Sequence, residues 1–91
     1  MAFAVSFSPV SMNTSKYDEC IKQLEAAGAG APAGRLYHAC YGSPDNLQVF
    51  DVWDSMASFD AFGQTLMPVL QGLGIDPGTP AVQEIHNIIT G

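Results

Sequence analysis

Positive charge is what this sequence has least of. Only Lys16, Lys22 and Arg35 are basic, against nine aspartate and glutamate residues, so the net charge is −6. A surface that binds nucleic acid must neutralise many phosphates, and three cations cannot supply it. The same negative charge repels anionic lipid. We therefore expect neither nucleic acid nor a membrane as a partner.

Long apolar runs, a basic leader and a cysteine motif are also missing. No apolar stretch approaches the ~20 residues of a membrane span, and the N-terminus lacks the positive region of a secretory signal. Cys20 and Cys40 form no Cys-x-x-Cys pair, so we interpret them as reduced, packed thiols. The two histidines and the scattered carboxylates show no metal-ligand spacing. These absences predict a cytoplasmic protein without a metal site.

Apolar residues, in contrast, are abundant. Of the 91 residues 47% are hydrophobic and only 13% are charged, about half the usual charged fraction. This length allows one domain, residues 1–91, which buries roughly 60–65% of its unfolded surface. So much apolar surface with so few charges favours burial against a second copy of the chain, as a symmetric homodimer. A compact monomer is the alternative.

Period-two alternation and helical spacing predict six elements. Strands are expected over residues 2–8, 35–41, 47–53 and 81–90. One helix begins after a cap at Asn13 or Thr14, and its apolar positions are Tyr17, Cys20, Ile21 and Leu24. A second helix begins after Ser55, and Pro68 should kink it or divide it near Met67.

The resulting order, β-α-β-β-α-β, is typical of a ferredoxin-like α+β sandwich. In that fold a four-stranded antiparallel sheet carries two helices on one face. The strands nevertheless offer apolar residues to both sides of the sheet, as Val49 and Trp53 alternate with Phe50 and Val52. A sheet that is apolar on both faces needs a second cover. The sheet of a second chain would provide it, so the geometry also favours a homodimer.

Several segments resemble those of a known family. They are the strand end Val52-Trp53-Asp54-Ser55, the following Phe59 and Phe62, the Leu66-Met67-Pro68 break, and the closing Glu84-Ile85-His86-Asn87-Ile88-Ile89. Together with the element order, they look like the dimeric α+β barrel proteins, and most like the antibiotic biosynthesis monooxygenase-like domains. The resemblance implies a homodimer whose sheets face one another, with a small apolar pocket in each protomer between sheet and helices.

The resemblance leaves the activity open, because the family includes cofactor-independent quinone-forming oxygenases, haem-degrading enzymes, isomerases and proteins without a known reaction. The haem-degrading members place a histidine ligand on the second helix, and this chain has no histidine between Ser55 and Gly74. No flavin or nicotinamide fingerprint is present either. Any oxygenase activity is therefore expected to need no cofactor, with the substrate carbanion itself reacting with oxygen.

His38 is the natural candidate for a general base or acid, because an imidazole titrates near neutral pH. Its neighbours depend on the register of the hairpin. A two-residue Pro44-Asp45 turn places His38 opposite Asp51, with Leu36 opposite Trp53 on the same face. Asp51 would then orient the imidazole beside an indole, as in a site that deprotonates a planar phenol.

The other register has a three-residue loop that ends with Asn46 in the left-handed conformation. It places His38 among Phe50, Val52 and Cys40 instead. Both registers are compatible with the sequence, and in either one His38 could simply be a half-buried imidazole bonded to a backbone or carboxylate partner.

Five further residues are candidates for ligand binding. They are Trp53, Tyr37, Phe50, Phe62 and His86. The aromatic residues would shape an apolar pocket, although core or interface packing explains them equally simply. His86 is predicted to lie in the last strand, where it could complete a pocket with His38 or bridge the sheet or the dimer contact.

Two functions follow from these residues. The first is a monooxygenase-like or isomerase-like homodimer that acts on an aromatic or polyketide-like molecule, with His38 as base. The second is a non-catalytic homodimer that binds a small apolar ligand or assembles with partners. The enzyme hypothesis requires a cavity of at least ~300 Å³ lined by His38 or His86.

Overall fold

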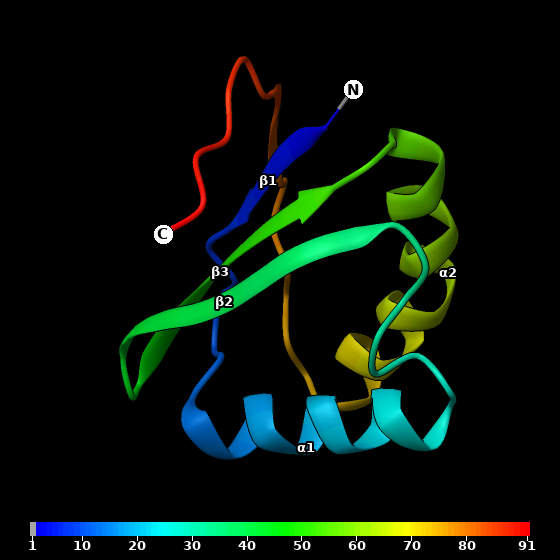
Figure 1. Cartoon of the computed structure of the whole chain (residues 1–91). Helices are drawn as coiled ribbons and strands as arrows, with labels where there is room; N and C mark the ends of the chain where they lie inside the picture. Colours follow the sequence, from blue (N-terminus) through cyan, green and yellow to red (C-terminus); the bar gives the residue numbers. More distant parts are fainter. Residues whose placement is uncertain (1) are drawn as a thin grey trace.

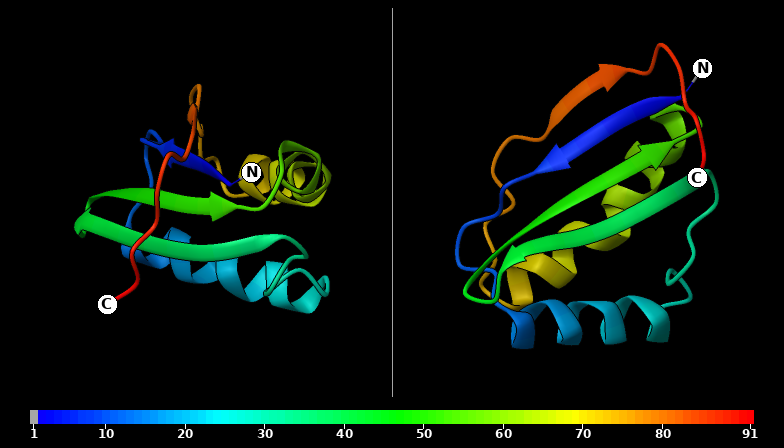
Figure 2. Two further views of the ribbon diagram at one scale, coloured as in Figure 1. Left: turned by 45° about the horizontal axis from the view of Figure 1, so that its top comes forward. Right: turned by 60° about the vertical axis from the view of Figure 1, so that its left-hand side comes forward.

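Four strands and two helices alternate as β-α-β-β-α-β in a computed structural model that describes residues 2–91 (Figure 1). The elements are β1 (Phe3–Phe7), α1 (Thr14–Ala26), β2 (Arg35–Ser43), β3 (Asn46–Trp53), α2 (Met56–Gly72) and β4 (Ala81–Glu84). The strands form one antiparallel sheet in the order β2-β3-β1-β4, and both helices cover the same face (Figure 2). The predicted ferredoxin-like arrangement is confirmed.

Both helices begin at the caps that the sequence predicts. The Lys16 N–H donates to Asn13 Oδ1 at 2.8 Å, and the Ser58 N–H donates to Ser55 Oγ at 3.1 Å, so each cap satisfies a backbone donor of the first turn. Pro68 lies inside α2 without dividing it. The predicted division was wrong, because packing of the helix against the core outweighs one lost backbone bond. Neither helix of the described chain is long and apolar enough to cross a membrane.

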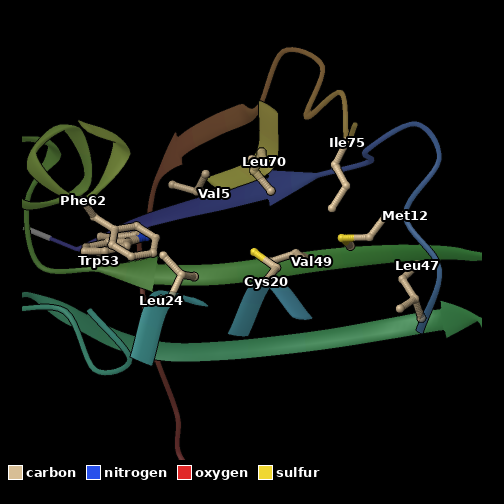
Figure 3. Close-up of a cluster of buried hydrophobic side chains, with 10 residues drawn as sticks. All are labelled: Val5, Met12, Cys20, Leu24, Leu47, Val49, Trp53, Phe62, Leu70 and Ile75. Atoms are coloured by element: carbon tan, nitrogen blue, oxygen red, sulfur yellow. The ribbon is translucent and has the colours of Figure 1, made fainter. Parts of the chain in front are cut away.

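The core fills the space between the sheet and the helices (Figure 3). Its buried members are Val5, Met12, Cys20, Leu24, Leu47, Val49, Trp53, Phe62, Leu70 and Ile75. Trp53 and Val5 are completely buried. Both cysteines are free thiols, as predicted, and burial raises the pKa of each. The core therefore occupies the layer in which any site between sheet and helices must form.

The β2–β3 hairpin closes through the two-residue Pro44-Asp45 turn, and His38 pairs with Asp51. The alternative loop with a left-handed Asn46 was wrong, since Ser11 is the only non-glycine residue of residues 2–91 with a positive φ. The tip of the hairpin is tied to the start of α1, because the Thr14 N–H donates to the Pro44 carbonyl at 3.0 Å.

A β-bulge at Leu36 changes the far end of this hairpin. Arg35 pairs with Trp53, and Tyr37 pairs with Val52, so Leu36 has no partner of its own. The prediction that Leu36 lies opposite Trp53 was therefore wrong. The extra residue shifts Arg35 onto the face that carries His38.

The last strand is shorter than the sequence predicts. β4 ends at Glu84, which pairs with Phe3, the first residue of β1. A strand continuing to Thr90 was wrong: the Ile85 N–H still donates to the Ala2 carbonyl at 2.8 Å, and after this bond the chain leaves the sheet. Residues 85–91 instead leave the sheet and cross its outer face, the face opposite the helices (Figure 2).

Candidate functional site

A hydrogen-bonded chain of three side chains connects α1 to the sheet. His38 Nδ1 lies 2.5 Å from Asp51 Oδ1, and His38 Nε2 lies 2.7 Å from the Tyr17 hydroxyl. The phenol and imidazole rings are parallel within 3°, with centroids 6.0 Å apart. Helix α1 contributes Tyr17, while the antiparallel pairing of β2 with β3 contributes the other two residues. We call Tyr17, His38 and Asp51 the relay.

Asp51 sets the tautomer of the imidazole. It is only 3% exposed, and its second oxygen accepts a hydrogen bond from Trp53 Nε1 at 3.4 Å. An ionised carboxylate only accepts hydrogen bonds, so His38 Nδ1 must carry the proton that it shares with Asp51. In the neutral imidazole Nε2 is then an acceptor, and the Tyr17 hydroxyl donates to it.

Tyr17 stays protonated over the whole physiological range. Burial, followed by the nearby Cys40 thiol, raises the pKa of Tyr17 to about 12, although the Arg35 guanidinium acts in the opposite direction. A neutral phenol can pass its own proton to His38 and accept another at its oxygen. Because His38 Nε2 already bonds to the Tyr17 hydroxyl, a proton moving between His38 and a ligand passes through Tyr17.

The relay lines a small cavity between the sheet and the two helices. Its volume is about 60 Å³, and most of its walls are apolar side chains such as Leu24, Phe62 and Leu66. Arg35 also lines it. The cavity is smaller than the ~300 Å³ expected of a site for a drug-sized molecule. As it stands it has room for a few water molecules, and an aromatic ligand requires its side chains to move apart.

A larger hollow of about 750 Å³ lies on the outer face of the sheet, where residues 85–91 cross it. Tyr37, Phe50 and Val52 line it on the sheet side, and Ile85 and Ile88 line it on the other. In the described part of the chain, no histidine or carboxylate side chain lines this hollow. It resembles an apolar contact surface more than a site of acid-base chemistry.

The structure thus divides the predicted site residues between two faces. His38, Asp51 and Phe62 line the inner cavity, and Tyr37 and Phe50 line the outer hollow. Trp53 lies behind Asp51, completely buried, and orients its carboxylate.

His86 lies apart from the other candidates. It is exposed, lies beyond the end of β4 and lines neither the inner cavity nor the outer hollow. Of the roles predicted for it, a pocket shared with His38 was wrong, because the strand that would direct His86 inward ends at Glu84. A role in the dimer contact stays a prediction. Within the described part of the chain, no three His, Cys, Asp or Glu side chains come together as metal ligands.

Sequence reasoning missed Tyr17 and Arg35 as site residues. Tyr17 was one of four apolar positions of a helix, and nothing local shows that it meets a histidine 21 residues away. The available signal was its hydroxyl, since a buried tyrosine usually finds a polar partner. Arg35 was hidden because the bulge that directs it inward has no clear signature in the sequence.

No family model matches the chain, and no curated protein matches it in sequence. Solved structures do match it over nearly its full length. A candidate antibiotic biosynthesis monooxygenase from Chloroflexus aurantiacus is 17% identical, with 100% of both chains covered and a TM-score of 0.64. SnoaB, a cofactor-independent oxygenase from Streptomyces nogalater, is 14% identical, with 99% of this chain and 96% of that chain covered and a TM-score of 0.62.

A candidate antibiotic biosynthesis monooxygenase from Deinococcus radiodurans is similar too, at 12% identity and a TM-score of 0.63, with 99% of this chain and 97% of that chain covered. At these identities the likeness concerns architecture. The chain has the ferredoxin-like α+β fold of antibiotic biosynthesis monooxygenase-like domains.

Proposed function

We propose that this protein is a cofactor-independent oxygenase-type enzyme that deprotonates a hydroxylated aromatic or polyketide-like molecule. The observation that carries the proposal is the relay, a buried carboxylate, imidazole and phenol in series beside an apolar cavity. An oriented imidazole next to a carboxylate is a suitable general base. The likeness to SnoaB, a cofactor-independent oxygenase, adds support from the fold.

In the proposed reaction a phenolic substrate gives its hydroxyl proton to the Tyr17 oxygen while Tyr17 passes its own proton to His38 Nε2. Asp51 stabilises the imidazolium that results. A ring carbon of the substrate anion then bonds to molecular oxygen, and the proton held on His38 returns through Tyr17 to give a hydroperoxide. Its O–O bond breaks as the same ring carbon loses its hydrogen. One oxygen atom remains as the new carbonyl of a quinone, and the other leaves as water with that hydrogen and the returned proton. Carbon-bound electrons supply the reduction, so the step uses no flavin or metal.

Oxygen uptake tests this proposal. We expect the wild-type protein to consume oxygen with members of a panel of polycyclic phenols and hydroquinones, and Tyr17→Phe to lower the rate by about 10²-fold, since the variant keeps the ring but loses the proton carrier. Ser15→Ala on the same helix is the control and should retain the wild-type rate. Equal rates for Tyr17→Phe and wild type would remove the relay from the mechanism.

A non-catalytic, ligand-binding homodimer is the second candidate. The small volume of the inner cavity, about 60 Å³, favours it, because no aromatic substrate fits there without displacement of side chains. The same panel separates the two candidates. Saturable binding of a phenol without oxygen uptake would favour the second.

Either function is proposed to operate in a homodimer in which the outer faces of the two sheets meet. Large apolar side chains are exposed there, including Leu36 at 60% and Tyr37 at 57%, and such patches commonly mark interfaces. We expect light scattering to give a mass of twice 9.6 kDa.

Charge placed on the outer face should break this dimer. Tyr37→Asp buries a carboxylate at the proposed contact and is expected to give monomers. Met67→Asp is the matched control, because Met67 is 40% exposed on α2, which covers the face of the sheet opposite the proposed contact, and it should remain dimeric. A monomeric wild-type protein at micromolar concentration would contradict the dimer.

A further inference from the structure

Arg35 lies in the inner cavity because of one irregularity in the sheet. Residues 35 and 38 are three apart, so a regular strand would direct their side chains to opposite faces. The bulge at Leu36 places Arg35 opposite Trp53, while His38 lies opposite Asp51. Arg35 consequently shares the inner face with His38 and lines the same cavity. Bulges often redirect a side chain in this way next to a functional site.

The guanidinium of Arg35 has no acidic partner among residues 2–91. The chain carries nine carboxylate side chains, yet within residues 2–91 none of them forms an ion pair with Arg35. In the described structure, its one hydrogen bond is to the Gly30 carbonyl at 3.1 Å. A guanidinium has five N–H donors, so most of them remain available to a ligand in the cavity.

Contacts within the protein also hold Arg35 in position before any ligand binds. Its Cζ lies 5.8 Å from the centre of the buried Phe62 ring, within the range of a cation-π contact. The preceding Gly34 has a φ of 87°, and a Cβ there would come within 2.4 Å of Ser58 and 2.5 Å of Asp54. The Asp54 N–H donates to the Gly34 carbonyl at 2.8 Å. The start of β2 is therefore held closely against the start of α2.

We infer that Arg35 binds the oxyanion of the ligand, so that the cavity selects a planar aromatic molecule carrying a carboxylate or a phenolate. The inference rests on the proposed function, and it defines the class of substrate. The Tyr17 hydroxyl and the Arg35 guanidinium line one cavity, so a proton can leave toward Tyr17 while the negative charge that remains faces Arg35. A bidentate guanidinium suits an oxyanion better than a point charge would.

Binding of three small probes tests this inference. The probes are 4-nitrophenol, which absorbs differently as phenol and phenolate, benzoate as the carboxylate, and 4-nitroanisole as a neutral aromatic of similar shape. We expect the wild-type protein to bind at least one of the two anions and to lower the apparent pKa of bound 4-nitrophenol if the phenolate is the preferred form. Arg35→Gln should weaken anion binding by roughly tenfold to a hundredfold and leave 4-nitroanisole binding unchanged.

Lys22→Gln is the matched control, because it removes the same charge from an exposed position on α1 and should change none of the three affinities. If Arg35→Gln does not fold, Arg35→Lys gives the same comparison, with an intermediate loss of anion binding. Equal losses for the neutral probe and the anions, unchanged anion binding in the variant, or no anion binding by the wild-type protein would each overturn the inference.

The proposed function and this inference can fail separately. If anion binding depends on Arg35 but no phenol causes oxygen uptake, the inference is supported and the proposed oxygenase activity is contradicted. If oxygen uptake is unchanged in Arg35→Gln, the proposed oxygenase activity is supported and the oxyanion-binding role of Arg35 is contradicted.

Discussion

Replacing Trp53 with alanine should lower the free energy of unfolding by about 3–5 kcal/mol. Trp53 is 0% exposed, and its ring centre lies 5.7 Å from that of Phe59 and 5.4 Å from that of Phe62. Truncation would leave a cavity between β3 and α2 and would remove a donor from the buried Asp51. Small domains have only about 5–15 kcal/mol of stability in total, so much of the variant should be unfolded. Urea denaturation measures the loss.

Two further variants, compared with Trp53→Ala, show whether the loss of stability comes from lost packing of the indole. Trp53→Phe retains most of the buried ring and should cost clearly less than the alanine variant. Met67→Ala removes a long side chain from the 40% exposed position on α2 and should be nearly neutral, within about 0.5 kcal/mol. A loss below about 1 kcal/mol for Trp53→Ala would mean that the indole is not part of a closely packed core.

Replacing Asp51 with asparagine should reduce oxygenase turnover by roughly 10³–10⁴-fold, as carboxylate-to-amide changes do in other histidine-centred proton-transfer systems. The Asp51 carboxylate lies 2.5 Å from His38 Nδ1, which favours the tautomer with the proton on Nδ1. An asparagine amide can donate to Nδ1, which places the imidazole proton on Nε2. Nε2 would then donate to Tyr17 and could no longer accept its proton. Oxygen uptake with the best substrate of the panel is the measurement.

Asp60→Asn is the matched control for this change, because Asp60 is exposed on α2. It makes the same chemical replacement and should leave turnover intact. The free energy of unfolding should be measured in parallel, because the amide that replaces the Asp51 carboxylate would lie in a buried position and could lower stability. An Asp51→Asn protein that is folded and fully active would show that the carboxylate does not set the tautomer of a catalytic imidazole.

The sequence predicted those features that depend on local pattern. Alternation along residues 47–53 identified β3, and Asn13 and Ser55 marked where the helices begin. Each of these features depends on side chains within a few residues of one another. The two-residue turn was one of two possible registers, and it placed His38 opposite Asp51.

The features that were missed depend on contacts between distant segments. Tyr17 reaches His38 only because α1 packs across the sheet, and helical spacing does not define that packing. The Leu36 bulge is a local defect that strand alternation cannot reveal. The chain leaves the sheet just after the Ile85 N–H has bonded to the Ala2 carbonyl, so the apolar residues from Ile85 onward gave a misleading signal of strand length.

The bond between the hairpin tip and the start of α1 bears on the order of events during folding. His38 and Asp51 are 13 residues apart within one hairpin, whereas Tyr17 and His38 are 21 apart and belong to different elements. Shorter loops close at a lower entropic cost, so the hairpin can bring imidazole and carboxylate together before α1 is in place. The Thr14 to Pro44 bond anchors the helix one turn before Tyr17. We therefore expect the phenol to be the last member of the relay to join, so that the proton carrier is in place only once α1 has docked on the sheet.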